Sequence, residues 1–445
     1  MNGQLANAAT SKKRLIYAGV MALLFCALVW PVILSGSKRE DRIGAEGDQR
    51  LYHFPTIVKM AQAWPHPDLN DVGQGQMTPT FHVLMAALMH YCGLGLEGLR
   101  LVNSLTGLAL VLAVFWYTSK CADAPTAFAL CLPYLLSPFM LSCSMWLMTN
   151  NLALFFSTIA LAGAALFPPT TARVIGNGLA AMAATAVRQI SVWLIAPIAA
   201  AIICERLRFP ARVSTESEKN PPAPQLLLNL GIAVALPVAA LLFYFIQWHG
   251  LMPPTAQLQG VNNHFMIVPL ALAQTAFCCC FLAPATLEGP LIKYLRDWRV
   301  WAAAAFCLAL AALPHSATPN DPTGAVIAST KTPAILGRVI LWLPPAALGG
   351  AGLMAFLIAA AERSQARAAL IIMVGFGGWL AAHTTPAHAL RRYCDIILIM
   401  VIWLAAQCLP PGRKPFRFWF GIASLSLVQL ATAIYQIYLP VLWGK

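Results

Sequence analysis

The stretch GDQRLYHFP, residues 47–55, places an acid, an amide, a cation and two aromatic rings together in a chain with few charges. Asp48 is the residue best suited to catalysis, because a carboxylate can take a proton from an acceptor hydroxyl and make that oxygen a nucleophile. Tyr52 and His53 follow closely and could position a substrate. Asp is also a preferred N-cap, so Asp48 could instead only cap the helix that follows.

Arg188 and Gln189 lie in MAATAVRQISVWL, near the middle of an apolar stretch of about thirty residues. A central Arg costs about 2.5–3.5 kcal/mol on insertion scales, so it should face a polar cavity or an anionic partner. The alternative is a helix broken near Arg188, from which the side chain reaches the membrane interface. In that case, too, Arg188 and Gln189 would line a cavity embedded in the membrane.

Arg391 and Arg392 occur side by side in HTTPAHALRRYCD. Paired guanidinium groups are suited to bidentate recognition of phosphate. An equally simple interpretation is that they pair with Asp395, one turn further along.

Thr78 and His82 lie in QGQMTPTFH, residues 74–82, at the start of an apolar run. They could position a substrate, or they could only cap a helix. With Asp48 and the two sources of Arg, these residues suit sugar transfer from a lipid phosphate, in which a base activates the acceptor and cations stabilise the departing phosphate. No His/Asp cluster with ligand spacing is visible, so we expect no catalytic metal and no cofactor.

The elements that must position these residues are membrane helices. The chain of 445 residues is 59% hydrophobic and 10% charged, and its mean hydropathy is +0.69. Runs of about 18 or more apolar residues recur along it, which predicts an all-α, polytopic membrane protein of about thirteen spans. The expected spans are 15–34, 78–93, 100–118, 124–141, 149–167, 174–203, 225–246, 266–287, 300–314, 336–360, 367–383, 393–409 and 418–440. The first is interpreted as a retained signal anchor.

The basic loops predict the orientation of these spans. With the N-terminus in the cytoplasm, ERLRFPARVSTESEK (within 204–224), IKYLRDWR, ERSQAR and PGRKPFR all face inward, as the positive-inside rule requires. The long first loop, 35–77, then faces outward and carries Asp48. Its segment 49–63 has apolar residues at helical spacing, which predicts a helix at the membrane surface. We expect one integral-membrane domain over residues 1–445.

The composition also excludes other classes of protein. The net charge of +13 comes from cations that flank apolar spans, which explains it without nucleic acid. No segment outside the spans is long enough for a soluble nucleotide-sugar domain, so a donor would arrive through the bilayer. The twelve cysteines fall mostly inside apolar runs and are interpreted as free thiols.

Five motifs occur in a familiar order: GDQRLYHFP, MTPTFH, LRLVNSL, MTNNLALF and VRQISVW, over roughly residues 46–195. This order resembles the alpha-1,2-glucosyltransferase family of asparagine-linked glycosylation, which uses dolichyl-phosphate-glucose. That family lies within the GT-C class of multi-span glycosyltransferases. The resemblance implies a GT-C-like fold and an inverting hexosyltransferase whose active site faces away from the cytosol.

Matching residues carry the resemblance further. Asp48 matches the family's leading acid; Tyr52, His53 and Pro55 match its aromatic-His-x-Pro pattern; Thr78 and Pro79 match the start of its second span; and Arg188 and Gln189 match its Arg-Gln step. The chain departs from the family at Gln49, where a second acid is expected. Of the family's C-terminal signature only Arg392 and Tyr393 correspond.

These residues together imply transfer of a hexose, with glucose favoured, from a polyprenyl or dolichyl phosphate to a lipid-linked or cell-surface glycan. A bacterial cytoplasmic membrane is expected, with the endoplasmic reticulum as the alternative. Two other classes remain open. A lipid-linked sugar flippase would use Arg188 in a translocation path, and a noncatalytic subunit would use these residues only in assembly.

Overall fold

The computed structural model describes residues 2–36, 45–72, 77–207, 209, 223–254, 267–289, 291–312, 334–335, 338–339, 343–384, 394–410, 412, 414–439 and 441. Eight of the described helices are long and apolar enough to cross a membrane, and a helix pair bent by 70° would make a ninth crossing. The chain is therefore an integral membrane protein built of helices, as predicted. The predicted count of about thirteen spans is not confirmed.

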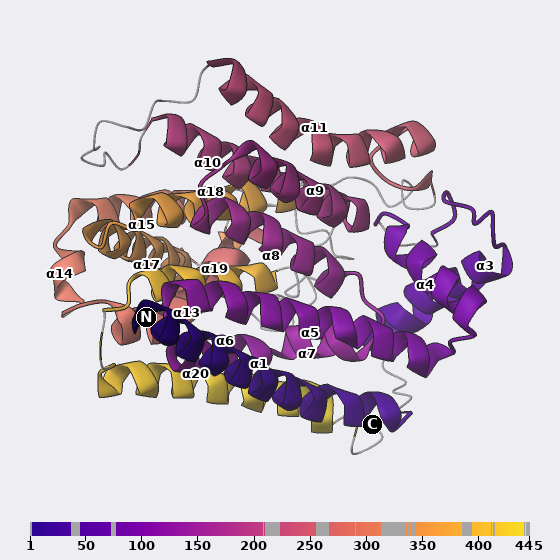
Figure 1. The fold of residues 1–445 in the computed structure, drawn as a ribbon, viewed down its shortest axis with the longest axis horizontal. Coiled ribbons are helices and arrows are strands. Elements are labelled where there is room, and N and C mark those ends of the chain that lie inside the picture. The colour runs from indigo at the N-terminus through magenta and orange to yellow at the C-terminus, as the bar shows by residue number, and fades with distance from the viewer. Residues whose placement is uncertain are drawn as a thin grey trace.

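The elements follow one another as α1 (Asn2–Leu34), α2 (Ala45–Asp48), η1 (Gln49–His53), α3 (Phe54–Gln62), α4 (Thr80–Cys92), α5 (Leu96–Cys121), α6 (Ala124–Leu135), α7 (Pro138–Met145), α8 (Asn150–Leu166), α9 (Thr171–Val187), η2 (Gln189–Leu194), α10 (Ile195–Arg206), α11 (Ala223–Trp248), α13 (Ile267–Thr286), α14 (Ile292–Leu295), α15 (Trp298–Ala311), β1 (Ala334–Ile335), β2 (Arg338–Val339), α17 (Leu343–Glu362), α18 (Ala366–His383), α19 (Asp395–Gln407), α20 (Phe416–Ala433) and η5 (Ile434–Tyr438). The long helices lie roughly alongside one another (Figure 1). The two short strands pair antiparallel.

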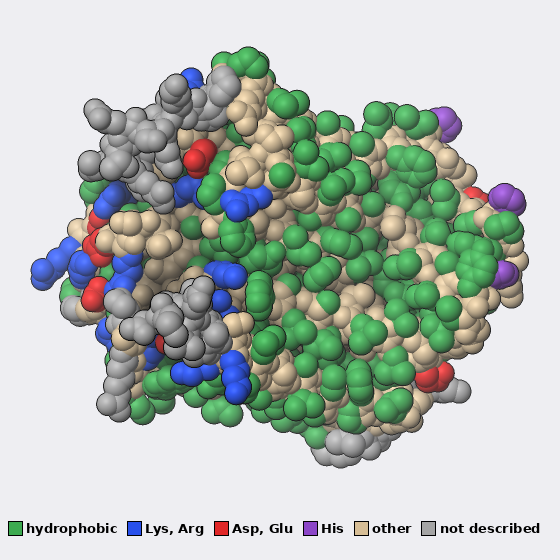
Figure 2. Space-filling model, viewed as in Figure 1, with side chains coloured by type: hydrophobic (Ala, Val, Ile, Leu, Met, Phe, Trp, Pro, Cys, Tyr) green, Lys and Arg blue, Asp and Glu red, His purple; other side chains and the backbone are tan. Residues whose placement is uncertain are grey.

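The described parts of the four loops predicted to face the cytoplasm lie together at one end of this bundle. They are joined by the contacts Arg367–Glu205, Lys293–Glu362, Arg363–Glu288 and Arg417 to the Leu287 carbonyl oxygen. Figure 2 shows Lys and Arg side chains gathered at this end, which also holds the N-terminus in Figure 1. We call it the basic end, and the positive-inside rule predicts that it faces the cytoplasm.

The first loop lies at the opposite end, where Figure 2 shows histidine side chains, and we call this the histidine end. Here α3 and α4 pack together beside the last turns of α11 (Figure 1). Trp248 Nε1 donates to the Leu69 carbonyl oxygen at 3.0 Å, and the hydroxyls of Thr80 and Tyr244 lie 2.6 Å apart. These contacts fasten the first loop to α11.

The predicted spans 78–93 and 174–203 show two ways in which the structure departs from the prediction. The predicted span 78–93 is α4, whose 13 residues reach about 20 Å, whereas hydrocarbon is about 30 Å thick. The predicted span 174–203 is divided at Arg188 into α9 and α10. The guanidinium of Arg367, at the basic end, donates to the Phe167 carbonyl oxygen just before α9 and lies 3.9 Å from Glu205 near the end of α10. The chain therefore reverses direction at Arg188.

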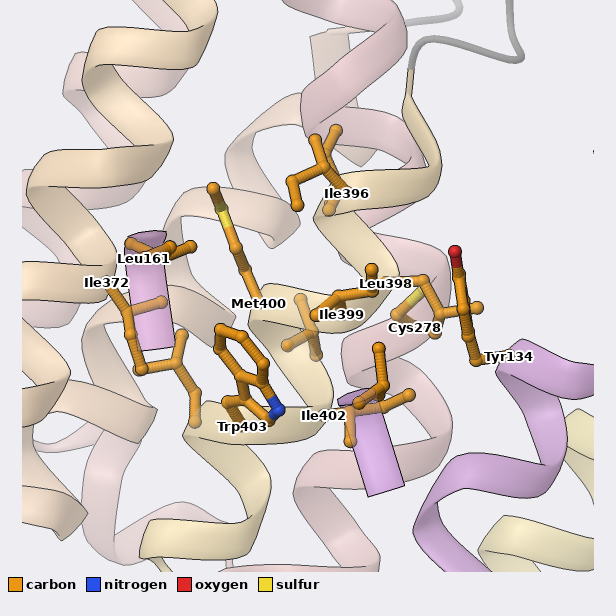
Figure 3. Packing of buried hydrophobic residues seen from close by; sticks show 14 of the residues in the cluster. Tyr134, Leu161, Cys278, Ile372, Ile396, Leu398, Ile399, Met400, Ile402 and Trp403 are labelled. Atoms are coloured by element: carbon orange, nitrogen blue, oxygen red, sulfur yellow. The ribbon is translucent and has the colours of Figure 1, made fainter. Parts of the chain in front are cut away.

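The core centres on α19, all of whose residues are buried. Its sequence DIILIMVIWLAAQ is apolar on every face, as expected of a helix enclosed by others. Figure 3 shows its side chains packed among Tyr134 of α6, Leu161 of α8, Cys278 of α13 and Ile372 of α18. The twelve cysteines are free thiols, as predicted, and most are buried.

Candidate active site

Asp48 lies within a helix instead of capping one. The helix begins at Ala45 and continues through η1 and α3, so the helix predicted over 49–63 is confirmed and starts earlier than expected. Asp48 has helical backbone angles (φ −64°, ψ −41°), and its side chain caps no backbone N–H. The alternative that Asp48 is only an N-cap is therefore wrong. Its half-buried carboxylate is held at the side of a helix that packs on the bundle.

The turn after Asp48 is a π-helical turn, in which the N–H of Phe54 donates to the Gln49 carbonyl oxygen. Pro55 explains it, because proline has no N–H to donate and its ring clashes with the carbonyl four residues earlier. Widening the turn over Gln49–His53 relieves that clash without ending the helix. Such π turns are frequent at functional sites.

Gln49 fixes this turn against the bundle. Its Oε1 accepts hydrogen bonds from Arg100 Nε at 2.9 Å and from the Leu147 N–H at 3.0 Å, and all three groups are buried. A neutral amide therefore binds the guanidinium at the position where the glucosyltransferase family carries a second acid. Arg100 was not among the predicted site residues, although the LRLVNSL motif contains it.

Replacing Gln49 with Ala should lower the free energy of unfolding by about 3 kcal/mol, because two buried donors lose their shared acceptor. Thermal unfolding of the purified protein in detergent measures this loss. Gln225→Ala, at an exposed position on α11, is the matched control. An unfolding temperature for Gln49→Ala equal to that of the control would contradict the anchoring role of Gln49.

Arg188 occupies the break between α9 and η2. Its backbone is extended (φ −147°, ψ 111°), its N–H donates to the Ala184 carbonyl oxygen at 2.8 Å, and its own carbonyl accepts from Ser191 at 2.9 Å. Its Nη1 donates to Asn150 Oδ1, the first residue of α8, at 2.7 Å. The alternative of a helix broken at Arg188 is thus confirmed, and the side chain faces the protein interior instead of lipid.

The Arg188 side chain lines a small cavity of about 30 Å³, as predicted both for a continuous helix and for a helix broken at this residue. Asn150 and Ser157 of α8, Ser191 and Trp193 after the break, and Trp379 and His383 of α18 complete the polar and aromatic part of its lining. This volume suffices for about one water molecule. Gln189 is half-buried at the start of η2 and is not among the lining residues.

His383 is a member of this site that the sequence did not single out. It ends α18, is buried, stacks on Trp379 with ring centres 4.3 Å apart, and donates from Nδ1 to the Trp379 carbonyl oxygen at 2.9 Å. In the sequence analysis it is only the last residue of the predicted span 367–383. Its spacing of four residues from Trp379 was the available signal, because such residues lie on one helix face.

The segment 147–150 joins the Asp48 turn to Arg188. Gln49 holds the N–H of Leu147, and Asn150, three residues along, holds Arg188. Three residues of chain span at most about 11 Å. The helix turn that carries the predicted base and the predicted phosphate-binding Arg therefore lie near one another at the histidine end.

His53 and His82 form a buried pair close to this turn. His53 Nδ1 lies 2.9 Å from His82 Nε2, and the rings are stacked. Tyr52 is half-buried, and its carbonyl oxygen accepts from the Thr56 hydroxyl. Thr78 Oγ1 and His82 Nδ1 are buried and have no hydrogen-bond partner among the residues that the structure describes. Burial lowers the pKa of His82, on the short helix α4, to about 4, so this ring is neutral near pH 7.

This burial predicts a pH-dependent stability. An unfolded His titrates near pH 6.5. Because the folded pKa is lower, the stability from neutral His82 is fully present above pH 6.5 and is lost as the pH falls toward 4, by up to about 3 kcal/mol. Thermal unfolding at pH 7.5 and 4.5 measures the loss, and His82→Gln should reduce the difference between the two temperatures. An unchanged difference would contradict it.

The remaining predicted site residues, Arg391 and Arg392, lie outside the described residues. Asp395, their proposed partner, is buried at the start of α19, where it accepts a hydrogen bond from Ser137 at 3.1 Å. Ser137 lies between α6 and α7, the helices bent by 70°. Among the residues that the structure describes, no three His, Cys, Asp or Glu side chains come together as metal ligands.

No family model and no curated protein matches this chain. Among solved structures, the apo oligosaccharyltransferase of Archaeoglobus fulgidus has a TM-score of 0.46 and 14% identity, over 96% of this chain and 55% of that one. The oligosaccharyltransferase AglB of the same organism, in complex with an inhibitory peptide and a dolichol-phosphate, has a TM-score of 0.45 and 15% identity over the same shares. The chain thus spans about half the length of these proteins. Since the TM-scores are below 0.5, the likeness carries no weight, and the case for a function depends on the site.

Proposed function

We propose that this protein is an inverting, membrane-embedded glycosyltransferase. It moves a hexose, with glucose favoured by the motif order, from a polyprenyl or dolichyl phosphate to a lipid-linked or cell-surface glycan. The reaction takes place at the histidine end, on the side of the membrane away from the cytoplasm. The single observation that supports it most is that segment 147–150 holds the Asp48 turn through Gln49 and holds Arg188 through Asn150.

In the proposed reaction, the Asp48 carboxylate takes the proton of the acceptor hydroxyl. The acceptor oxygen forms a bond to the anomeric carbon of the sugar, while the bond from that carbon to the phosphate oxygen breaks. A direct displacement of this kind inverts the anomeric configuration. The lipid phosphate leaves with an additional negative charge, which the guanidinium of Arg188 stabilises. General-base help of this kind is worth about 10²–10⁴-fold in rate.

The surroundings of Arg188 support a phosphate-binding role. The side chains that line its cavity are buried or half-buried, and an electrostatic contact in such surroundings is stronger than in water. One partner of its guanidinium is a neutral amide, Asn150, which could share it with an incoming anion. Arg391 and Arg392 are proposed as further cations for the same phosphate. His53, Tyr52, Gln189, Thr78 and His82 are proposed to position the substrates.

The direct test supplies the purified protein in detergent or nanodiscs with a panel of polyprenyl-phosphate hexoses and a glycan acceptor. We expect release of lipid phosphate together with formation of a glycosidic bond, for one sugar over the others. A panel that yields no product with any donor, from a protein that is folded and binds the lipid, would contradict the proposal.

A lipid-linked sugar flippase is the second candidate. The breaks at Arg188 and between α6 and α7 favour it, because discontinuous helices at buried sites are typical of transporters. Reconstituted vesicles separate the two functions. A flippase moves labelled lipid phosphate between leaflets without an acceptor, whereas the proposed transferase consumes it only when an acceptor is present.

A further inference from the structure

An apolar groove of about 790 Å³ lies between α13, α15, α17 and α18. Side chains such as Phe306, Leu353, Phe376 and Leu380 line it, and Arg299 is the only charged residue among the described lining residues. A groove of this composition has nothing to offer a sugar or a phosphate. It suits a hydrocarbon chain.

Two glycines among the groove residues have different surroundings. Gly350 lets α17 approach α15, because a Cβ there would lie 2.6 Å from the sulfur of Cys307 and 2.7 Å from the Ala303 carbonyl oxygen. Gly377, on α18, is different, because a Cβ there would meet no atom within 4 Å. A side chain at position 377 would therefore extend into the groove without disturbing the packing of the helices.

The groove and the Arg188 cavity share α18. Leu380 and Thr384 face the groove, while Trp379 and His383 face the cavity. Between Met373 and Thr384 the groove follows α18 for about 17 Å. Its other end, at Trp298 and Arg299, lies next to α14 at the basic end. The groove thus begins beside the proposed phosphate site and leads away from it along the direction of the helices.

We propose that this groove binds the polyisoprenoid tail of the lipid phosphate donor. The inference depends on the proposed function, because it assigns the tail of the molecule whose phosphate meets Arg188. If the donor phosphate binds at Arg188, its isoprenoid tail would leave past Thr384, where the apolar lining of the groove starts. The tail would lie between α15 and α18, and its burial would contribute to donor affinity in proportion to the apolar area covered.

The test compares Gly377→Phe with Gly231→Phe. Gly231 is an exposed glycine of α11 whose Cβ would also meet nothing within 4 Å, and it is not among the groove residues, so it is a matched control. Each variant is given the same hexose phosphate on an undecaprenyl tail or on a geranyl tail. We expect Gly377→Phe to raise KM for the long-tail donor by about tenfold, equivalent to about 1.4 kcal/mol, with kcat unchanged. KM for the short-tail donor should not change.

Equal KM values for Gly377→Phe and Gly231→Phe with the long-tail donor would overturn the proposal, and so would equal effects on both tails. Native mass spectrometry with undecaprenyl phosphate provides a readout that does not need transfer. We expect Gly377→Phe to retain less of this lipid than Gly231→Phe. Loss of bound phosphatidylglycerol alone, with undecaprenyl phosphate retained, would show that the groove holds membrane phospholipid. If no variant transfers sugar but the lipid difference persists, the proposed function fails and the groove assignment stands.

Discussion

Asp48→Asn is expected to lower kcat for sugar transfer by about 10²–10⁴-fold, because an amide cannot accept the proton of the acceptor hydroxyl. The substitution removes the charge and keeps the size of the side chain. Expression, unfolding temperature and donor binding should therefore stay close to those of the unsubstituted protein. Single-turnover transfer with a saturating lipid phosphate donor measures the effect on chemistry alone.

Asp68→Asn is the matched control for this experiment. Asp68 lies on the same loop, is exposed, and accepts a hydrogen bond from the Asn70 N–H. It should transfer sugar at the unsubstituted rate. Near-full activity of Asp48→Asn, or an equal loss in both variants, would refute the assignment of Asp48 as the base.

Arg188→Ala should lower kcat/KM by about 10²–10³-fold, the range found when one preorganised group that stabilises developing charge is removed. The reason is that the departing phosphate would lose a guanidinium in a site sheltered from water. Arg188→Lys should retain part of the activity, since an ammonium keeps the charge but lacks the planar fork. Steady-state kinetics with the undecaprenyl phosphate donor measure both variants.

Two controls separate this effect from damage to the fold. Arg173→Ala changes an Arg at the other end of α9, where Nη1 donates to the Pro168 carbonyl oxygen, and should leave kcat/KM unchanged. Asn150→Ala removes the Arg188 partner but keeps the guanidinium. If Asn150→Ala lowers the unfolding temperature as much as Arg188→Ala but keeps its activity, the loss in Arg188→Ala belongs to catalysis. Full activity of Arg188→Ala would contradict the role.

The basic loops predicted to share one side of the membrane do lie at one end of the bundle, although the predicted spans 78–93 and 174–203 were wrong. Hydropathy cannot separate a short helix at the surface from a span, so 78–93 was counted as a crossing although α4 is too short. It also merged α9 and α10, because no polar loop marks the reversal at Arg188. The extra predicted crossing before Arg188 and the missed reversal at Arg188 cancel, so the described parts of the basic loops after Arg188 still lie at the same end of the bundle. The loops between α4 and Arg188, such as 167–170, lie at the end of the bundle opposite to the one predicted for them.

The site shows a similar limit. Asp48, His53, His82 and Arg188 could be found from residue types alone, because charges and imidazoles are rare in so apolar a chain. Their partners could not, since Arg100 meets Gln49 across 51 residues and Asn150 meets Arg188 across 38. Contacts at such separation depend on which helices are neighbours, and local patterns do not determine that. The π turn at Pro55 was equally hidden.

The enclosed helix α19 has a consequence for how this protein is made. Its 13 residues reach about 20 Å, too short to span the hydrocarbon unaided, and it begins and ends in the buried polar residues Asp395 and Gln407. A segment this short, with a polar residue at each end, would not partition by itself from a translocation channel into lipid. It is held at its depth by α5, α6, α13, α17 and α18, which all precede it in the chain, so its insertion should depend on these helices being in place first.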